Sequence, residues 1–213
     1  MTYSSLREEL DAAPDPRFEL ELPPGWARRA PDDETLAAML GDLKRRLMQA
    51  QRPDVYAQLK PALERSFEEM QRNGVVAFFS AVDPDPGTLW LPASISASIR
   101  RAEPGKTLDD LARVLIRDHG ATALLGDPRT LRFERAETHR EGAEALVSRS
   151  IVYLTPMPGS RRRRALQLVA GFASMPDTPD DAPELERMRA LFDACVASLR
   201  WERADGPREG GSA

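Results

Sequence analysis

The amino-acid sequence predicts an α+β protein in which helices cover a mostly antiparallel sheet. Segments with alternating apolar and polar residues are joined by short turns, which is typical of antiparallel strands. Helical segments with an apolar stripe stand among these strands, and such stripes must be buried against a neighbouring layer. The chain has 213 residues, enough for one domain with a proper core. We expect an N-terminal arm over residues 1–16, a single α+β domain over 17–202 and a disordered tail over 203–213.

The first strand is predicted in the stretch FELELPPGW, which begins at Phe18. Its three apolar residues alternate with glutamates, so one face is expected to be buried. The two prolines cannot donate to a strand ladder, so the strand should end before them. Trp26 is expected to cover the end of the core, and a short helix is predicted before the strand, over residues 3–12.

Two amphipathic helices are predicted over residues 33–72, as a helical hairpin inserted after the first strand. Asp32 or Asp33 can cap the first of them, because a short side chain there accepts a hydrogen bond from the open first turn. Pro53 separates the two helices. Pro61 lies in the apolar stripe of the second helix, so we expect a kink or a helix restart there.

The remaining elements follow from turns and alternation. The stretch VVAFFSAV from Val75 predicts a strand buried on both faces, whereas ASISASIRR from Ala93 alternates cleanly and predicts a one-sided strand. Thr107 is expected to cap a helix that ends at His119. The stretch EALVSRSIVYLTPMPGSRRRRALQLVAGFAS predicts a long hairpin with PMPGSRRRR at its tip. A last helix has a buried stripe that includes Cys195.

Two short motifs near the ends of the domain carry a resemblance to a known family. The matching residues are Phe18, Leu20, Leu22, Pro24, Gly25 and Trp26 at the opening, and Phe192, Val196, Ser198 and Leu199 in the closing helix. With them the chain resembles the PsbP-like α/β sandwich superfamily, which includes the photosystem PsbP proteins, the actinobacterial LpqN-type lipoproteins and the DcrB-like bacterial proteins. The resemblance covers about residues 17–201.

This resemblance implies non-enzymatic work, namely binding, assembly or the chaperoning of secreted substrates, and it supplies no catalytic residues. The chain departs from the family in two ways. No lipobox cysteine stands near its start, so we do not expect a lipoprotein. The helical hairpin over 33–72 is also longer than the helix expected after the first strand.

Composition and charge exclude several classes of function. The formal net charge is −4, so there is no overall basic field to attract nucleic acid or anionic lipid. The single cysteine excludes an internal disulfide bond. Neither a secretory signal nor an apolar run of about 18 residues is present, so we expect a cytoplasmic protein without a membrane span.

No motif predicts catalysis, a metal or a cofactor. His119 and His139 have no second histidine or cysteine at metal-ligand spacing. Cys195 falls on the apolar stripe of its helix, as a core residue does. The stretch EPGKT at 103–107 lacks the first glycine of a phosphate-binding loop, so a turn followed by a threonine cap is expected there.

Two surfaces are candidates for contact with a partner protein. The run from Arg161 to Arg164 at the hairpin tip is either a solvated turn or a docking patch for an acidic partner or an anionic polymer. The apolar stripe of the helical hairpin either packs on the sheet or leaves a groove for another helix. The hairpin residues considered for that groove are Met39, Met48, Tyr56, Phe67 and Met70, and those of the run are Arg161, Arg162, Arg163 and Arg164.

The sequence therefore predicts a non-enzymatic accessory or chaperone-like factor that binds another protein, with a link to a bacterial secretion system. The first alternative is a small-molecule or lipid binder with a closed pocket between sheet and helices. That pocket would be lined by Trp26, Phe79, Trp90 and Tyr153. The second alternative is an enzyme, which would need His119 or His139 within hydrogen-bond reach of a carboxylate or hydroxyl.

Overall fold

The computed structural model describes residues 15–82, 87–89, 91–141 and 144–202. The helix expected over 3–12 and the tail expected over 203–213 lie outside these residues, as does Trp90. The helices are α2 (Asp33–Gln49), α3 (Pro53–Arg72), α4 (Leu108–His119) and α5 (Pro183–Ala197). None of the helices within the described part is both long and apolar enough to cross a membrane.

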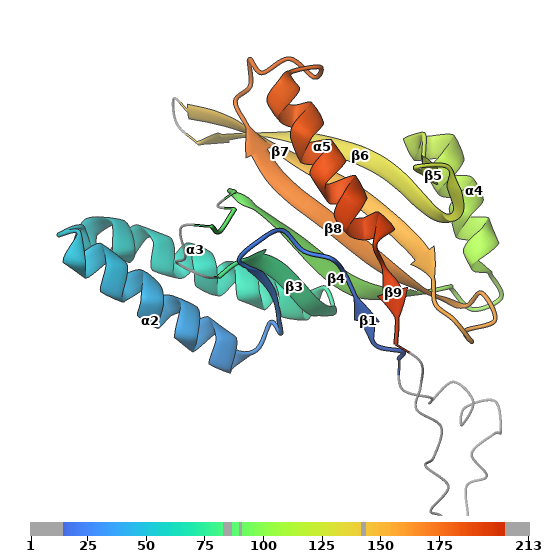
Figure 1. The fold of residues 1–213 in the computed structure, drawn as a ribbon, viewed down its shortest axis with the longest axis horizontal. Coiled ribbons are helices and arrows are strands. Elements are labelled where there is room, and N and C mark those ends of the chain that lie inside the picture. Colours follow the sequence, from blue (N-terminus) through green and yellow to red (C-terminus); the bar gives the residue numbers. More distant parts are fainter. Residues whose placement is uncertain (1–14, 83–86, 90, 142–143, 203–213) are drawn as a thin grey trace, which may run out of the picture.

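A seven-stranded sheet forms the centre of the protein (Figure 1). Its strands lie in the order β2-β3-β4-β8-β7-β6-β5, and all neighbours are antiparallel. The strands are β2 (Trp26–Arg29), β3 (Val75–Ala81), β4 (Ala93–Arg101), β5 (Thr122–Leu124), β6 (Asp127–Glu141), β7 (Glu144–Pro156) and β8 (Arg164–Ser174). This confirms the predicted α+β class with a helical hairpin after the first strand of the sheet.

α5 packs on one face of the sheet (Figure 1). Phe192 of α5 is completely buried, and its ring lies 6.4 Å from that of Trp26 and 5.9 Å from that of Phe172. Phe18 belongs to the same apolar cluster, so the two motifs at the ends of the domain meet in one core. We call this layer the α5 core.

The first strand does not begin where the sequence predicts it. The segment from Phe18 forms only β1 (Phe18–Glu19), which pairs with β9 (Arg200–Trp201) in a separate two-stranded sheet beside the α5 core. The central sheet starts at β2, after Gly25 turns the chain with a φ of 74°. The alternation at Phe18 was therefore correctly assigned to a buried face, but it was wrong to place it in the central sheet.

On the other face of the sheet, the helices of the described residues lie at the two ends. α3 contacts β3 at one end, where the rings of Phe67 and Phe78 lie 5.6 Å apart. At the other end, Leu108 and Leu115 of α4 pack in a second apolar cluster with Phe133 of β6. No helix among the described residues covers the strands between these two supports, and these strands form the site described below.

Local signals at the helix ends agree with the predictions. Asp32 caps α2 by accepting a hydrogen bond from the backbone N–H of Thr35 at 2.8 Å. Thr107 caps α4 in a capping box, and Gly120 follows the helix with a left-handed φ of 63°. Within α3, by contrast, the helix runs through Pro61 without the restart that the sequence allowed.

Candidate binding groove

The floor of the uncovered region is a row of serines on β4. Ser94, Ser96 and Ser98 point away from the α5 core because Ile95 and Ala97, which alternate with them, are completely buried in it. In the described part of the chain, the hydroxyls of Ser94 and Ser98 have no side-chain hydrogen bond, and that of Ser96 reaches only the Val169 carbonyl at 3.5 Å. These hydroxyls are available to a ligand.

The neighbouring strands continue this floor in register. Ser94 is paired with Gly171 of β8, which is paired in turn with Ser150 of β7. A Cβ atom added at Gly171 would meet no atom within 4 Å, so space is open directly above the backbone at this point. On β8, which lies between β4 and β7, the floor therefore has no side chain at position 171.

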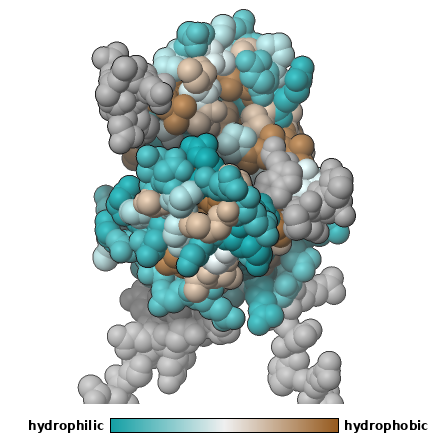
Figure 2. Space-filling model, turned by 90° about the vertical axis from the view of Figure 1, so that its left-hand side faces the viewer, coloured by the Kyte–Doolittle hydropathy of each residue, from teal (hydrophilic) through white to brown (hydrophobic). Residues whose placement is uncertain are grey.

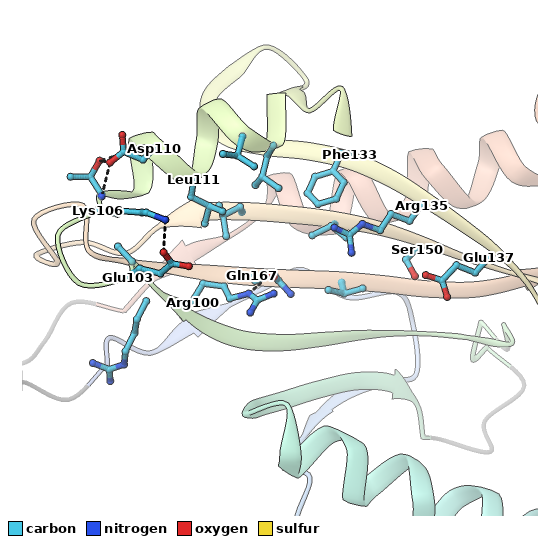
Figure 3. A pocket seen from close by; sticks show the side chains of 18 of the residues that line it. Arg100, Glu103, Lys106, Asp110, Leu111, Phe133, Arg135, Glu137, Ser150 and Gln167 are labelled. Carbon is cyan, nitrogen blue, oxygen red and sulfur yellow. Dashed lines mark hydrogen bonds and ion pairs between the residues drawn. The ribbon is translucent and has the colours of Figure 1, made fainter. Parts of the chain in front are cut away.

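A hollow of about 660 Å³ lies on the floor beneath α4 and is called here the α4 hollow. Its apolar wall is made by Leu111, Val114 and Leu115 of α4 together with Phe133, Val152 and Leu154 of the sheet. Polar groups stand at its rim, and Figure 3 shows Lys106, Asp110, Arg135 and Glu137 arranged around it. The α4 hollow thus has an apolar wall and charged side chains at its opening.

A second hollow of about 560 Å³, called here the hairpin hollow, lies between α3 and the serine floor. Its apolar side chains come from both helices of the hairpin and from β3. They are Met39 of α2, Leu63, Phe67 and Met70 of α3, and Val75 and Phe78 of β3. Together the two hollows form one groove, because they share Arg100, Gln167 and Val169 as lining residues.

The junction of the two hollows carries a positive charge. Arg100 is exposed and its Nε donates a hydrogen bond to Gln167 Oε1 at 2.7 Å, a contact drawn in Figure 3. Arg100 makes no ion pair with any carboxylate in the described residues. At the rim, the guanidinium of Arg135 lies 5.1 Å from the ring centre of Phe133, and Lys106 is already paired with Glu103.

The position of α4 over the floor is fixed from both of its sides. Its first turn is held by the Thr107 cap and by Arg162 of the β7–β8 turn, whose guanidinium donates to the Asp109 carboxylate at 2.7 Å. Its apolar stripe, including Leu115, packs against β6 and β7. These contacts hold α4 in place, and with it the wall that α4 contributes to the groove.

A buried polar network fastens α5 to the opposite face. Tyr153 of β7 is fully buried and donates its hydroxyl hydrogen to Asp193 at 2.7 Å, and Arg132 of β6 donates to the same carboxylate at 2.8 Å. Burial, and then this hydrogen bond, raise the pKa of the Tyr153 phenol. Hydrogen bonds from Arg132 and Arg189 outweigh burial at Glu134 and hold its pKa below the usual value.

The structure brings together three of the five hairpin residues proposed for partner contact. Met39, Phe67 and Met70 line the hairpin hollow, and Phe67 is also buried against β3. Met48 and Tyr56 lie outside the lining of both hollows, and Met48 is exposed. Figure 2 views the molecule from the hairpin end, where hydrophilic side chains cover most of the hairpin with apolar ones among them.

The arginine run at the hairpin tip is divided by the fold. Arg164 is buried and forms an ion pair with Asp15, while Arg162 pairs with Asp109 of α4. Arg161 and Arg163 are exposed. Two arginines of the run thus form ion pairs within the protein, and the role of the run as a docking patch stays a prediction.

The aromatic residues proposed to line a closed pocket lie elsewhere. Trp26, Phe79 and Tyr153 fill the α5 core, with exposed fractions of 7%, 2% and 0%. None of the three lines either hollow. Their side chains face α5 because they occupy the strand positions that alternate with the groove face.

His119 and Cys195 pack against other side chains of the fold, whereas the prediction for His139 is untested. His119 stacks on Phe133 with ring centres 5.3 Å apart, and the side chain of His139 lies outside the described part. Cys195 is buried in the α5 core, and burial raises the pKa of its thiol. Among the residues that the structure describes, no three His, Cys, Asp or Glu side chains come close enough to hold a metal ion.

In the part of the chain that the structure describes, the fold is an α+β sandwich with α5 packed on one face of the sheet and a groove between α3 and α4 on the other. No protein-family model matches the chain, and no curated protein matches it in sequence. A solved structure, that of LpqN, described as involved in cell envelope biogenesis of Mycobacterium tuberculosis, is similar to it. The TM-score is 0.40 at 13% identity, over 89% of this chain and 86% of LpqN. This likeness concerns the fold alone.

Proposed function

We propose that this protein is a non-enzymatic binding protein that holds an extended segment of another protein in the groove. The observation that carries the proposal is the order of surfaces along the groove. The apolar wall of the α4 hollow and the apolar wall of the hairpin hollow stand at either end of a floor that carries serines. Such a surface fits a ligand that is apolar at two places and polar between them.

The serine floor supports an extended segment as the ligand. Within a helix the backbone N–H and C=O groups bond to one another, whereas those of an extended chain need outside partners. The hydroxyls of Ser94, Ser98 and Ser150, which make no side-chain hydrogen bond in the described part, can supply such partners. Serines also keep the floor hydrated when the groove is empty, which suits reversible binding.

A second candidate function rests on the α4 hollow by itself. Its volume of about 660 Å³ is in the range of small-molecule sites. A compound with an apolar body and an anionic group could use the wall at Leu111 and the guanidinium of Arg100. It would leave the hairpin hollow unused, so a protein segment accounts for more of the surface.

A photo-crosslinking experiment tests the proposal. A photoreactive amino acid is placed at Val114, which lines the α4 hollow and is 40% exposed, and in a matched control at Arg187 on the exposed side of α5. We expect crosslinks from Val114 to one segment of a partner, mapped by mass spectrometry. The variant Gly171→Trp, which fills the open space in the floor, should abolish them. Equal crosslinking from both positions, or crosslinks that survive Gly171→Trp, would refute a groove-bound segment.

The same experiment addresses the wider role. A chaperone-like link to secretion, which the sequence resemblance implies, predicts that the crosslinked segment belongs to a secreted protein or a secretion component. A cytoplasmic location is kept as a prediction, and cell fractionation tests it. A partner from neither group would remove secretion from the proposal and leave the groove as the binding site.

A further inference from the structure

We infer that the groove selects segments with an acidic side chain at their centre, and that Arg100 is the residue that reads it. This inference rests on the proposed function and adds the chemistry of the segment. The position of Arg100 is the first argument. It lines both hollows, so a ligand that spans the groove must pass its guanidinium.

The second argument is that a hydrogen bond orients the Arg100 guanidinium while no ion pair in the described residues neutralises its charge. Its Nε is held by Gln167 Oε1 at 2.7 Å, which leaves the two terminal nitrogens for a ligand. Arginine presents these donors in a planar fork that matches a carboxylate. Within the described part, no carboxylate forms an ion pair with Arg100, although Glu69 of α3 lines the neighbouring hollow.

The other charges of the groove balance one another more closely. Lys106 is paired with Glu103 across the turn before α4. Arg135 and Glu137 alternate on the same face of β6, so their opposite charges lie near each other at the rim. Arg101 and Asp110 also line the α4 hollow and Glu69 lines the hairpin hollow, but Arg100 is the charged residue that lines both hollows. An acidic residue of the ligand at that junction would pair with it.

The distribution of apolar surface distinguishes a peptide from an amphiphile. A fatty acid or an alkyl phosphate has one charged end and one apolar tail. Here the charged centre is flanked on both sides, by Leu111 and Phe133 in one hollow and by Phe67 and Met70 in the other. An apolar–acidic–apolar peptide matches both flanks, whereas an amphiphile fills one.

Selection from a displayed library of random 12-residue peptides tests the inference without knowledge of the natural partner. The full chain is used as bait, and Gly171→Trp is the blocked control. We expect enriched peptides with Asp or Glu at a central position and apolar residues on both sides. With Arg100→Glu as bait, the central preference should change to Lys or Arg, because the sign of the reading charge is reversed.

One selected peptide is then synthesised with the central acid and with its amide. The acidic form should bind the wild type roughly ten- to a hundredfold more tightly, since a charge-assisted hydrogen bond is worth about 1.5–3 kcal/mol. Against Arg100→Gln the two peptides should bind almost equally. Arg100 is exposed, so both variants should fold, and circular dichroism checks this.

The outcomes separate this inference from the proposed function. Peptides that are enriched and blocked by Gly171→Trp but show no acidic position would overturn the inference and leave the proposed function standing. If nothing is enriched over the blocked control, both fall. Dodecyl phosphate is tested in parallel: if it binds in an Arg100-dependent way while no peptide is enriched, the groove is an amphiphile site and the inference is overturned.

Discussion

Removal of the Asp193 carboxylate should destabilise the protein more than removal of any surface carboxylate. Asp193 accepts hydrogen bonds from Tyr153, which is fully buried, and from Arg132, whose side chain is 19% exposed. In Asp193→Ala both donors lose this acceptor. Loss of one partner of a buried ion pair costs about 3–5 kcal/mol. We expect the lower end, about 3 kcal/mol, because Arg132 keeps its bond to Glu134 at 2.6 Å.

Urea denaturation measures this loss. With a slope of roughly 2 kcal/mol per molar urea, the midpoint of Asp193→Ala should fall by about 1.5 M without a change in slope. The matched control is Asp42→Ala, which removes an exposed ion pair with Arg45 on α2 and should cost less than about 1 kcal/mol.

A double-mutant cycle assigns the effect to the named contact. Tyr153→Phe removes only the hydroxyl that Asp193 accepts. The combined variant should be less destabilised than the sum of the two single variants, because they share one hydrogen bond. The reasoning fails if Asp193→Ala loses no more stability than Asp42→Ala, or if the two substitutions are strictly additive.

Three further outcomes are expected. Because burial raises the pKa of Tyr153 in the folded state, its contribution to stability is complete below about pH 10 and declines as the pH rises above it; the phenolate absorbance of Tyr153 should therefore appear only with unfolding, and the difference spectrum against Tyr153→Phe identifies it. Cys195 should react with a thiol-reactive disulfide at least about a hundredfold more slowly in the folded protein than in denaturant, since only an exposed thiolate is a good nucleophile; equal rates would show that the face of α5 that carries Cys195 is not buried in the α5 core. Thr107→Ala should lower stability by about 1 kcal/mol by removing the cap of α4, while the exposed Thr138→Ala should have little effect in the same thermal unfolding assay.

The strand that forms the groove floor could be predicted from the sequence, but the groove could not. The alternation of Ile95 and Ala97 with serines correctly indicated a one-sided strand. A serine face reads as an ordinary solvated face, however. Only the distant packing of α3 at Phe78 and of α4 at Phe133 shows that this face lies between two walls.

Arg100, to which we assign recognition of the ligand, is a residue that sequence reasoning missed. It continues the even-numbered positions of Ser94, Ser96 and Ser98, so its side of the sheet could have been found from the same alternation. Its importance comes from Gln167, which lies 67 positions away in the chain and is brought beside it by the pairing of β4 with β8. No local pattern contains that neighbour.

The error at Phe18 has a physical reason as well. The α5 core is lined both by the central sheet and by the small β1–β9 pair. An alternation that buries Phe18 in this core therefore fits a strand of either sheet, and the pattern by itself does not distinguish them. The strand that does begin the central sheet, β2 (Trp26–Arg29), is short and ends in two arginines. Such a segment gives almost no periodic signal.

The pairing of β1 with β9 joins the place where the described chain enters the domain to the place where it leaves, with Phe18 opposite Trp201 (Figure 1). Tension applied through these two points would break the residue pairs of β1 and β9 one after the other, so the pair would offer little mechanical resistance. The same neighbourhood means that the domain could be spliced into a surface loop of another protein on a single stalk. The stalk would stand on the α5 side, and the open face would remain accessible.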